Sequence, residues 1–139
     1  MGNSYSTIWP LNNIVSFVHE TGIPFVIPRS MKDLLKNDVE ARQFFDNFNV
    51  AVKEQLQKQS LVIIPLKTTK PPVRIVKFRV VHEKHTSKRN GYRCIALVDD
   101  INQIIFILDI YTHKQKNNFS KAEKDNYRKI GKFYLALVK

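Results

Sequence analysis

The sequence has few of the residues that build disulfide frameworks, zinc modules and phosphate loops. Its one cysteine, Cys94, excludes an intramolecular disulfide framework and a cysteine-rich zinc module. Its 4 glycines are widely scattered and form no glycine-rich phosphate loop. No apolar run approaches the roughly 20 residues that span a bilayer. No charged stretch followed by an apolar one indicates a secretory signal. These absences predict a cytoplasmic protein without membrane contact.

Other absences restrict the catalytic chemistry. The histidines at 19, 82, 85 and 113 lack the spacing of a metal site, and no GxSxG sequence marks a serine hydrolase. We therefore expect neither a metal nor a cofactor. The chain is not short of core-forming residues, since 43% of its 139 residues are hydrophobic and 9 are phenylalanine. That composition excludes a disordered chain and suits one domain of ordinary size.

Acidic residues are scarce in the second half of the chain. Residues 1–66 contain 6 basic and 6 acidic residues, whereas residues 67–139 contain 17 basic and 6 acidic ones, so the whole net charge of +11 lies there. Between Lys67 and Arg93 there are 9 basic residues and a single acid, Glu83. Such asymmetry indicates a polyanionic partner, either a nucleic acid or an acidic protein. The alternative is a solvated basic face that serves solubility alone.

Hydrophobic periodicity predicts an α+β fold. Helical spacing occurs over 11–19 and most clearly over 39–58, and Ser30 is a candidate N-cap for a short helix over 31–36. Residues 25–27 lie between two prolines and predict a short edge strand, and a further strand is predicted over 61–66. Three strands over 73–84, 92–98 and 103–111 follow, joined by Asn90-Gly91 and a second turn, and predict an antiparallel sheet.

The C-terminal region begins with a clear helix start. Ser120 and Glu123 have the spacing of a capping box, and Gly131 is expected to end the helix near Ile130. Residues 132–139 fit either a final strand or a continuation of the helix.

Metal-free RNA cleavage needs a base for the 2′-hydroxyl, cations for the transition state and an acid for the leaving oxygen. Histidine, or a lysine crowded by other cations, can transfer protons near neutral pH, and arginine binds phosphate. Adjoining strand ends carry such groups at Lys84, His85, Lys88, Arg89, Arg93, His113, Lys114 and Lys116. Plain RNA binding fits the same residues.

The stretch from Val73 to about Ile130 resembles the RelE/ParE superfamily of bacterial toxins, in particular the HigB-like branch of ribosome-dependent mRNA endonucleases. The resemblance rests on three pieces in order: the basic segment ending in Asn90-Gly91-Tyr92-Arg93, the hydrophobic strand 104–110, and the run from Tyr111 to Glu123. It covers about 58 of the 139 residues.

The resemblance implies a RelE-like α+β fold in which helices pack on one face of a twisted antiparallel sheet. Residues 1–22 would form an N-terminal extension and residues 23–139 the toxin domain. It implies cleavage of mRNA in the 30S A site of the ribosome without a metal, and neutralisation by an antitoxin protein. The family also contains gyrase-directed toxins, and a non-catalytic nucleic-acid- or ribosome-binding module is the other alternative.

Residue by residue, the resemblance assigns phosphate binding to Arg93 and basic catalytic positions to His113 and Lys116, with Lys84 in the basic segment before them. Phe119 stands where some members have a catalytic tyrosine, which favours His113 for proton transfer. The expected RNA contacts are Lys77, Arg79, Lys88, Arg89, Tyr111 and Lys114. Two alternatives stay open: Arg93 as a salt-bridge partner of Asp99 or Asp109, and Tyr111 as a packed residue of the sheet.

Overall fold

The computed structural model describes residues 5–8, 14–56, 61–65, 73–80, 91–112, 115 and 119–138. The elements in chain order are β1 (Ser6–Ile8), α1 (Ile14–Thr21), α2 (Arg29–Leu35), α3 (Asp38–Ala51), the π-helical turn η1 (Val52–Leu56), β2 (Leu61–Pro65), β3 (Val73–Val80), β4 (Tyr92–Asp99), β5 (Ile104–Thr112) and α4 (Lys121–Leu137). The predicted α+β class is confirmed. Within the described part, no helix is long and apolar enough to cross a membrane.

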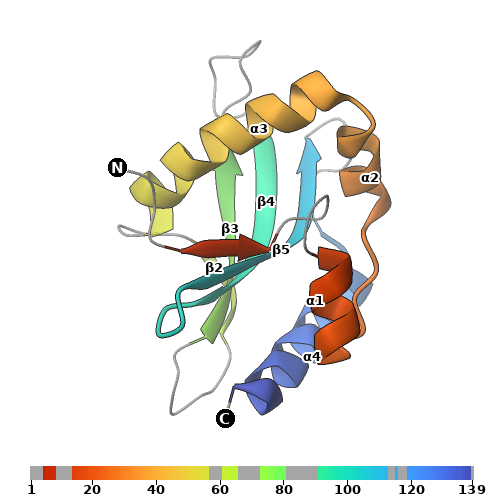
Figure 1. Ribbon diagram of the computed structural model, residues 1–139, viewed down its shortest axis with the longest axis vertical. Coiled ribbons are helices and arrows are strands. Elements are labelled where there is room, and N and C mark those ends of the chain that lie inside the picture. The colour runs from red at the N-terminus through yellow and green to blue at the C-terminus, as the bar shows by residue number, and fades with distance from the viewer. Residues whose placement is uncertain are drawn as a thin grey trace.

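The strands form one five-stranded sheet in the order β1-β5-β4-β3-β2 (Figure 1). β3, β4 and β5 pair antiparallel, as their sequence pattern predicts, and β2 joins them antiparallel to β3, whereas β1 pairs parallel with the first residues of β5. The sheet is therefore mixed rather than wholly antiparallel. Parallel pairing of β1 was not predicted because a three-residue strand carries no periodic signal, and its partner lies almost 100 positions away.

Helices cover both faces of the sheet, so the expectation of helices on one face is wrong. Phe44 and Phe48 of α3 stack against Tyr92 and Phe78, with ring centroids 5.3 and 5.6 Å apart. Tyr134 of α4 instead donates a hydrogen bond to Asp99, which lies seven residues after Tyr92 and faces the other way. Figure 1 shows α3 across one end of β3 and β4, and α4 toward the other end of the molecule.

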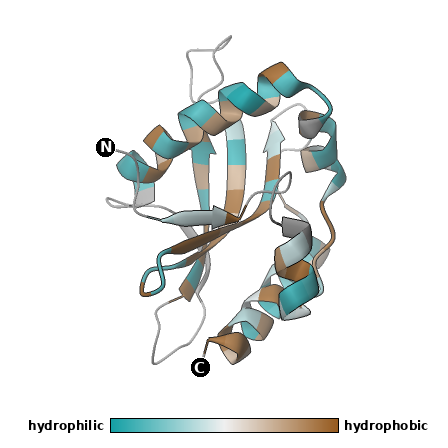
Figure 2. Cartoon of the chain, viewed as in Figure 1, coloured by the Kyte–Doolittle hydropathy of each residue, from teal (hydrophilic) through white to brown (hydrophobic). Residues whose placement is uncertain are grey.

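The central strands β4 and β5 are buried because both of their faces are covered. Every residue of β4, and every residue of β5 from Ile105 to Tyr111, is buried. The apolar run of β5 does not alternate with polar residues, which is typical of a strand that is covered on both faces. Figure 2 shows hydrophobic residues through these strands and mixed colouring on the helices.

α4 begins as predicted but ends later. The Ser120 hydroxyl accepts from the Glu123 backbone, and the Glu123 carboxylate accepts from the Ser120 backbone, which completes the capping box. The helix does not end at Gly131 but continues to Leu137, which settles the open alternative for this segment as helix. Gly131 lies with Tyr127 on the buried stripe, so packing on the sheet outweighs the roughly 1 kcal/mol cost of a mid-helix glycine.

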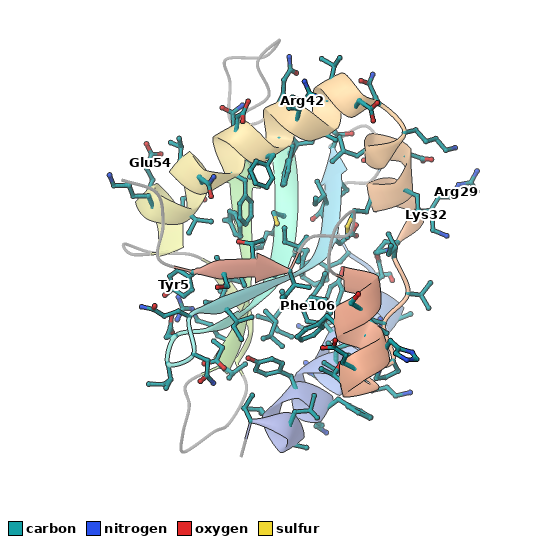
Figure 3. All side chains as sticks on the ribbon, viewed as in Figure 1. Tyr5, Arg29, Lys32, Arg42, Glu54 and Phe106 are labelled. Atoms are coloured by element: carbon teal, nitrogen blue, oxygen red, sulfur yellow. The ribbon has the colours of Figure 1, made fainter. Side chains whose placement is uncertain are left out.

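The N-terminal segment belongs to the same fold. β1 completes the sheet, the Tyr5 hydroxyl donates to Asp100 at 2.7 Å, and Arg74 forms an ion pair with the same carboxylate (Figure 3). Phe17 of α1 packs edge-on against Phe106.

Residues 25–27 form no strand, contrary to prediction. They connect α1 to α2, and Phe25 packs on the ring of Phe106 instead. The first three residues of β5, from Ile104 to Phe106, are already paired with β1 along this edge. The predicted helices over 31–36 and 39–58 are confirmed in their described parts, although α2 begins at Arg29 and has Pro28 at its N-cap rather than Ser30.

Candidate nucleic-acid interface

Three basic residues occupy neighbouring positions on one face of the sheet. Arg79 of β3 lies directly opposite Arg93 of β4, and Lys77 lies opposite Ile95 in the next row. Because side chains alternate along a strand, Lys77 and Arg79 share a face, and cross-strand partners share it with them. We call Lys77, Arg79 and Arg93 the cationic triad.

The two arginines form a close pair. Arg79 donates its backbone N–H to Gln55 Oε1 at 3.1 Å, and its carbonyl accepts from Gln55 Nε2 at 2.6 Å. Both backbone groups of Arg79 thus point away from β4, which makes Arg79 and Arg93 a non-hydrogen-bonded pair of the antiparallel ladder. Such pairs bring the Cα atoms to about 4.5 Å, and like charges placed there destabilise the sheet.

The three side chains of the triad differ in their exposure to solvent. Arg79 is exposed, Lys77 is half-buried, and Arg93 is only 6% exposed. Burial lowers the pKa of Lys77 below its ordinary value, and the nearby charges of Arg93 and Arg79 lower that pKa further. Among the described residues, Arg74 of the same strand has an acidic partner, whereas Lys77 and Arg79 have none. Lys77 and Arg79 can therefore accept an anion from solvent.

Arg93 is placed as an interior residue. Its Nη1 donates to the carbonyl of Gly91 at 3.0 Å, two residues earlier in the chain. Of the two predicted salt-bridge partners, Asp109 lies one row away on the same face, and Asp99 lies at the other end of β4. The burial of Arg93 leaves Arg79 as the arginine of the triad that solvent reaches most freely.

Tyr111 is also an interior residue. It lies directly opposite Arg93 on β5 and is completely buried, in agreement with the alternative that it packs in the sheet rather than stacking on a base. Tyr127 of α4 covers the same region, and its hydroxyl has no hydrogen-bond partner among the described residues. Burial raises the pKa of Tyr127, and the charge of Asp109 raises it further, so this phenol stays protonated at neutral pH.

Six of the ten predicted site residues lie outside the described residues: Lys84, Lys88, Arg89, His113, Lys114 and Lys116. The strands around them are described. β3 ends at Val80, β4 begins at Tyr92, and Thr112 at the end of β5 lies directly opposite Tyr92. We call residues 81–90, after β3, the first basic segment and residues 113–118, after β5, the second. Both segments are therefore joined to the same end of the sheet, where Arg79 and Arg93 lie.

Gln115, which lies in the second basic segment, is hydrogen-bonded to the end of β5 and to α2. Its backbone N–H donates to the Thr112 carbonyl at 3.0 Å, and its Oε1 accepts from the Thr112 N–H at 2.8 Å. Its Nε2 donates to the carbonyl of Ser30 at 3.2 Å, which ties the end of β5 to α2. Sequence reasoning missed both Gln55 and Gln115, because a lone glutamine forms no recognisable pattern.

No group of three or more metal-ligating side chains that could hold an ion occurs among the described residues. Comparison with known proteins identified no relative: no protein-family model, curated protein or solved structure matches the chain.

Proposed function

We propose that this chain binds RNA through the cationic triad and is a ribosome-dependent mRNA endonuclease, the toxin of a toxin–antitoxin pair. The observation that supports RNA binding is the arginine pair: Arg79 opposite Arg93, with Lys77 beside them. A fold gains nothing in stability from like charges in a close cross-strand pair. A phosphodiester bound to the solvent-facing Arg79 and Lys77 would offset this charge, and arginine and lysine are the residues that bind phosphate best.

Cleavage is supported by the order of the basic segments at that end of the sheet. Lys84 lies in the first segment, after β3, and His113 and Lys116 lie in the second, after β5. If RNA bound with a backbone phosphate on Arg79, cleavage would need a proton-transfer group from one of these segments beside the neighbouring 2′-hydroxyl. His113 can take or give the proton at neutral pH, and the cations would stabilise the transition state without a metal.

A non-catalytic RNA-binding module is the second candidate, and the burial of Arg93 favours it. The resemblance assigns phosphate contact to Arg93, yet this side chain is 6% exposed and bonds the carbonyl of Gly91. In such a module Arg79 and Lys77 would bind the RNA backbone and no proton transfer would follow.

Induced expression in bacteria separates these functions. We would map mRNA 5′ ends with and without translation initiation, for the wild-type chain and for Arg79→Ala, His113→Ala and Arg42→Ala. Arg42 is an exposed arginine of α3, so its replacement matches the charge change of Arg79→Ala (Figure 3). Ends within translated codons that require initiation, and that disappear in the first two variants only, would support the endonuclease.

Other results would refute the endonuclease. Growth arrest with intact mRNA would indicate a gyrase-directed toxin. RNA binding without arrest or new ends would indicate the non-catalytic module. Equal cleavage by Arg79→Ala and wild type, at equal expression, would contradict the role of the triad.

A further inference from the structure

Gln55 takes the place of a neighbouring strand beside Arg79. Among the described residues, the pairing of β2 with β3 extends as far as Leu61 opposite Lys77, and the backbone of Arg79 lies two residues further along β3. Its N–H and carbonyl are both bonded by the Gln55 side chain, at 3.1 and 2.6 Å. A primary amide carries one donor group and one acceptor, which is what a strand residue would otherwise supply.

The π-helical turn places Gln55 at this edge. α3 has ordinary helical geometry to Ala51 and then widens into η1. π-helical turns are rare and are frequently found at functional sites. Figure 3 shows Glu54 at the outer surface of this turn, while the next residue, Gln55, reaches back to β3.

From this contact we infer that Gln55 is a positioning residue that holds Arg79 for the phosphodiester backbone of RNA. The inference rests on the proposed RNA binding. The described part of β2 ends opposite Lys77, and among the described residues it is Gln55 that bonds the backbone of Arg79 on the side away from β4. The two hydrogen bonds from Gln55 fix the backbone of Arg79, and with it the point on the sheet from which the guanidinium extends. An arginine held beforehand loses less conformational freedom when a phosphate binds.

A second feature distinguishes this contact from a simple edge cap. An edge strand is commonly protected by a charge, a proline or a bulge, none of which fixes a particular residue. Here the bonded residue is the exposed member of the cationic triad, and its neighbour Lys77 is held by the β2 ladder. The two triad members on β3, Lys77 and Arg79, are therefore both held from the side opposite β4.

Gln55→Met tests the inference, because methionine has a similar length and neither donates nor accepts these bonds. We would measure amide hydrogen exchange at Arg79 and the affinity for a fluorescent single-stranded oligoribonucleotide of about 12 nucleotides. We expect exchange at Arg79 about tenfold faster and affinity about fivefold weaker, in keeping with the loss of one or two hydrogen bonds. Asn126→Met, which replaces an exposed amide on α4, is the matched control.

The double variant with Arg79→Ala gives the readout that a purely structural role would not change. If Gln55 acts through Arg79, Gln55→Met should weaken binding in the wild-type background and add nothing once Arg79 is alanine. Unchanged exchange at Arg79 would overturn the contact, and faster exchange with unchanged affinity would overturn the positioning role. If the wild-type chain does not bind the oligoribonucleotide, the proposed function fails, and the positioning role fails with it. That result differs from the first two because Arg79→Ala would then be silent as well.

Discussion

Asp99 is the buried acid that ends β4, and it organises the turn into β5. It accepts hydrogen bonds from the backbone of Ile101 and Asn102, from the Asn102 side chain at 2.8 Å and from the Tyr134 hydroxyl at 2.7 Å. Burial raises the pKa of this carboxyl, but the bonds from Asn102 and Tyr134 outweigh burial and hold it below the ordinary value of 3.8. Such a group stabilises the fold above its ordinary pKa, and the contribution is lost as pH falls through the lowered pKa.

We expect Asp99→Asn to lower the free energy of unfolding at pH 7 by about 1.5–3 kcal/mol, the range for hydrogen bonds to a charged group. The variant should also lose less stability than the wild type between about pH 4 and pH 2, because its side chain does not titrate. Urea unfolding at several pH values measures both effects. If the variant loses as much stability as the wild type when the pH is lowered, this role of Asp99 is contradicted.

The charge of Lys77 in the cationic triad lowers the stability of the fold, whereas the charge of Asp99 raises it. Its pKa is lowered by burial and by the two arginines, so the folded chain releases this proton more readily than the unfolded chain. Protonated Lys77 therefore costs stability at neutral pH, and the cost falls as pH rises through the lowered pKa toward 10.5.

We expect Lys77→Met to raise stability at pH 7 by a few tenths to about 1 kcal/mol while weakening RNA binding. Urea unfolding and oligoribonucleotide titration measure the two quantities, with Lys129→Met on the exposed side of α4 as the control. A loss of stability in the Lys77 variant would show that the triad is not repulsive.

At the scale of elements, the start of α4 is the feature read most directly from sequence. Ser120 and Glu123 satisfy each other's backbone N–H groups, as their spacing indicates. We expect Ser120→Ala to cost about 1 kcal/mol of stability, the usual loss for an N-cap. Chemical denaturation measures this loss. Ser16→Ala, at an exposed position of α1, is the control. If both variants unfold at the same denaturant concentration as the wild type, the capping box does not stabilise the helix.

Elements that depend on distant contacts were not predictable. Gly131 carries a local signal to end a helix, but its position on the buried stripe beside Tyr127 is decided by the sheet. The parallel strand Ser6–Ile8 depends on a partner far along the chain. Local patterns describe what a segment prefers, and these elements are set by what it packs against.

The candidate site also combines features that local sequence patterns predict with features that depend on distant contacts. Alternation along β3 was enough to put Lys77 and Arg79 on one face, and the structure adds that Arg93 joins them from β4. The packing of Tyr111 in the sheet was one of the alternatives left open by the sequence, whereas the burial of Arg93 could not be predicted because it depends on which helices cover which face. Gln55 was missed because its partner is a backbone rather than a side chain.

For the whole molecule, the distribution of charge is the property that matters most. The net charge of +11 arises entirely after residue 66, and the described part of that region places Lys77 and Arg79 toward solvent without acidic partners. Each phosphate contact to single-stranded RNA releases counterions, so the logarithm of affinity should fall with the logarithm of salt concentration by about 0.7 per contact.

The most direct test is the salt dependence of RNA affinity for the wild type, Arg79→Ala and Arg42→Ala. If the triad binds the RNA backbone, Arg79→Ala should weaken binding at every salt concentration and reduce the slope by about 0.7 to 1. Arg42→Ala, with the same change of charge, should keep the wild-type slope. Equal affinities and slopes for Arg79→Ala and Arg42→Ala would contradict the account.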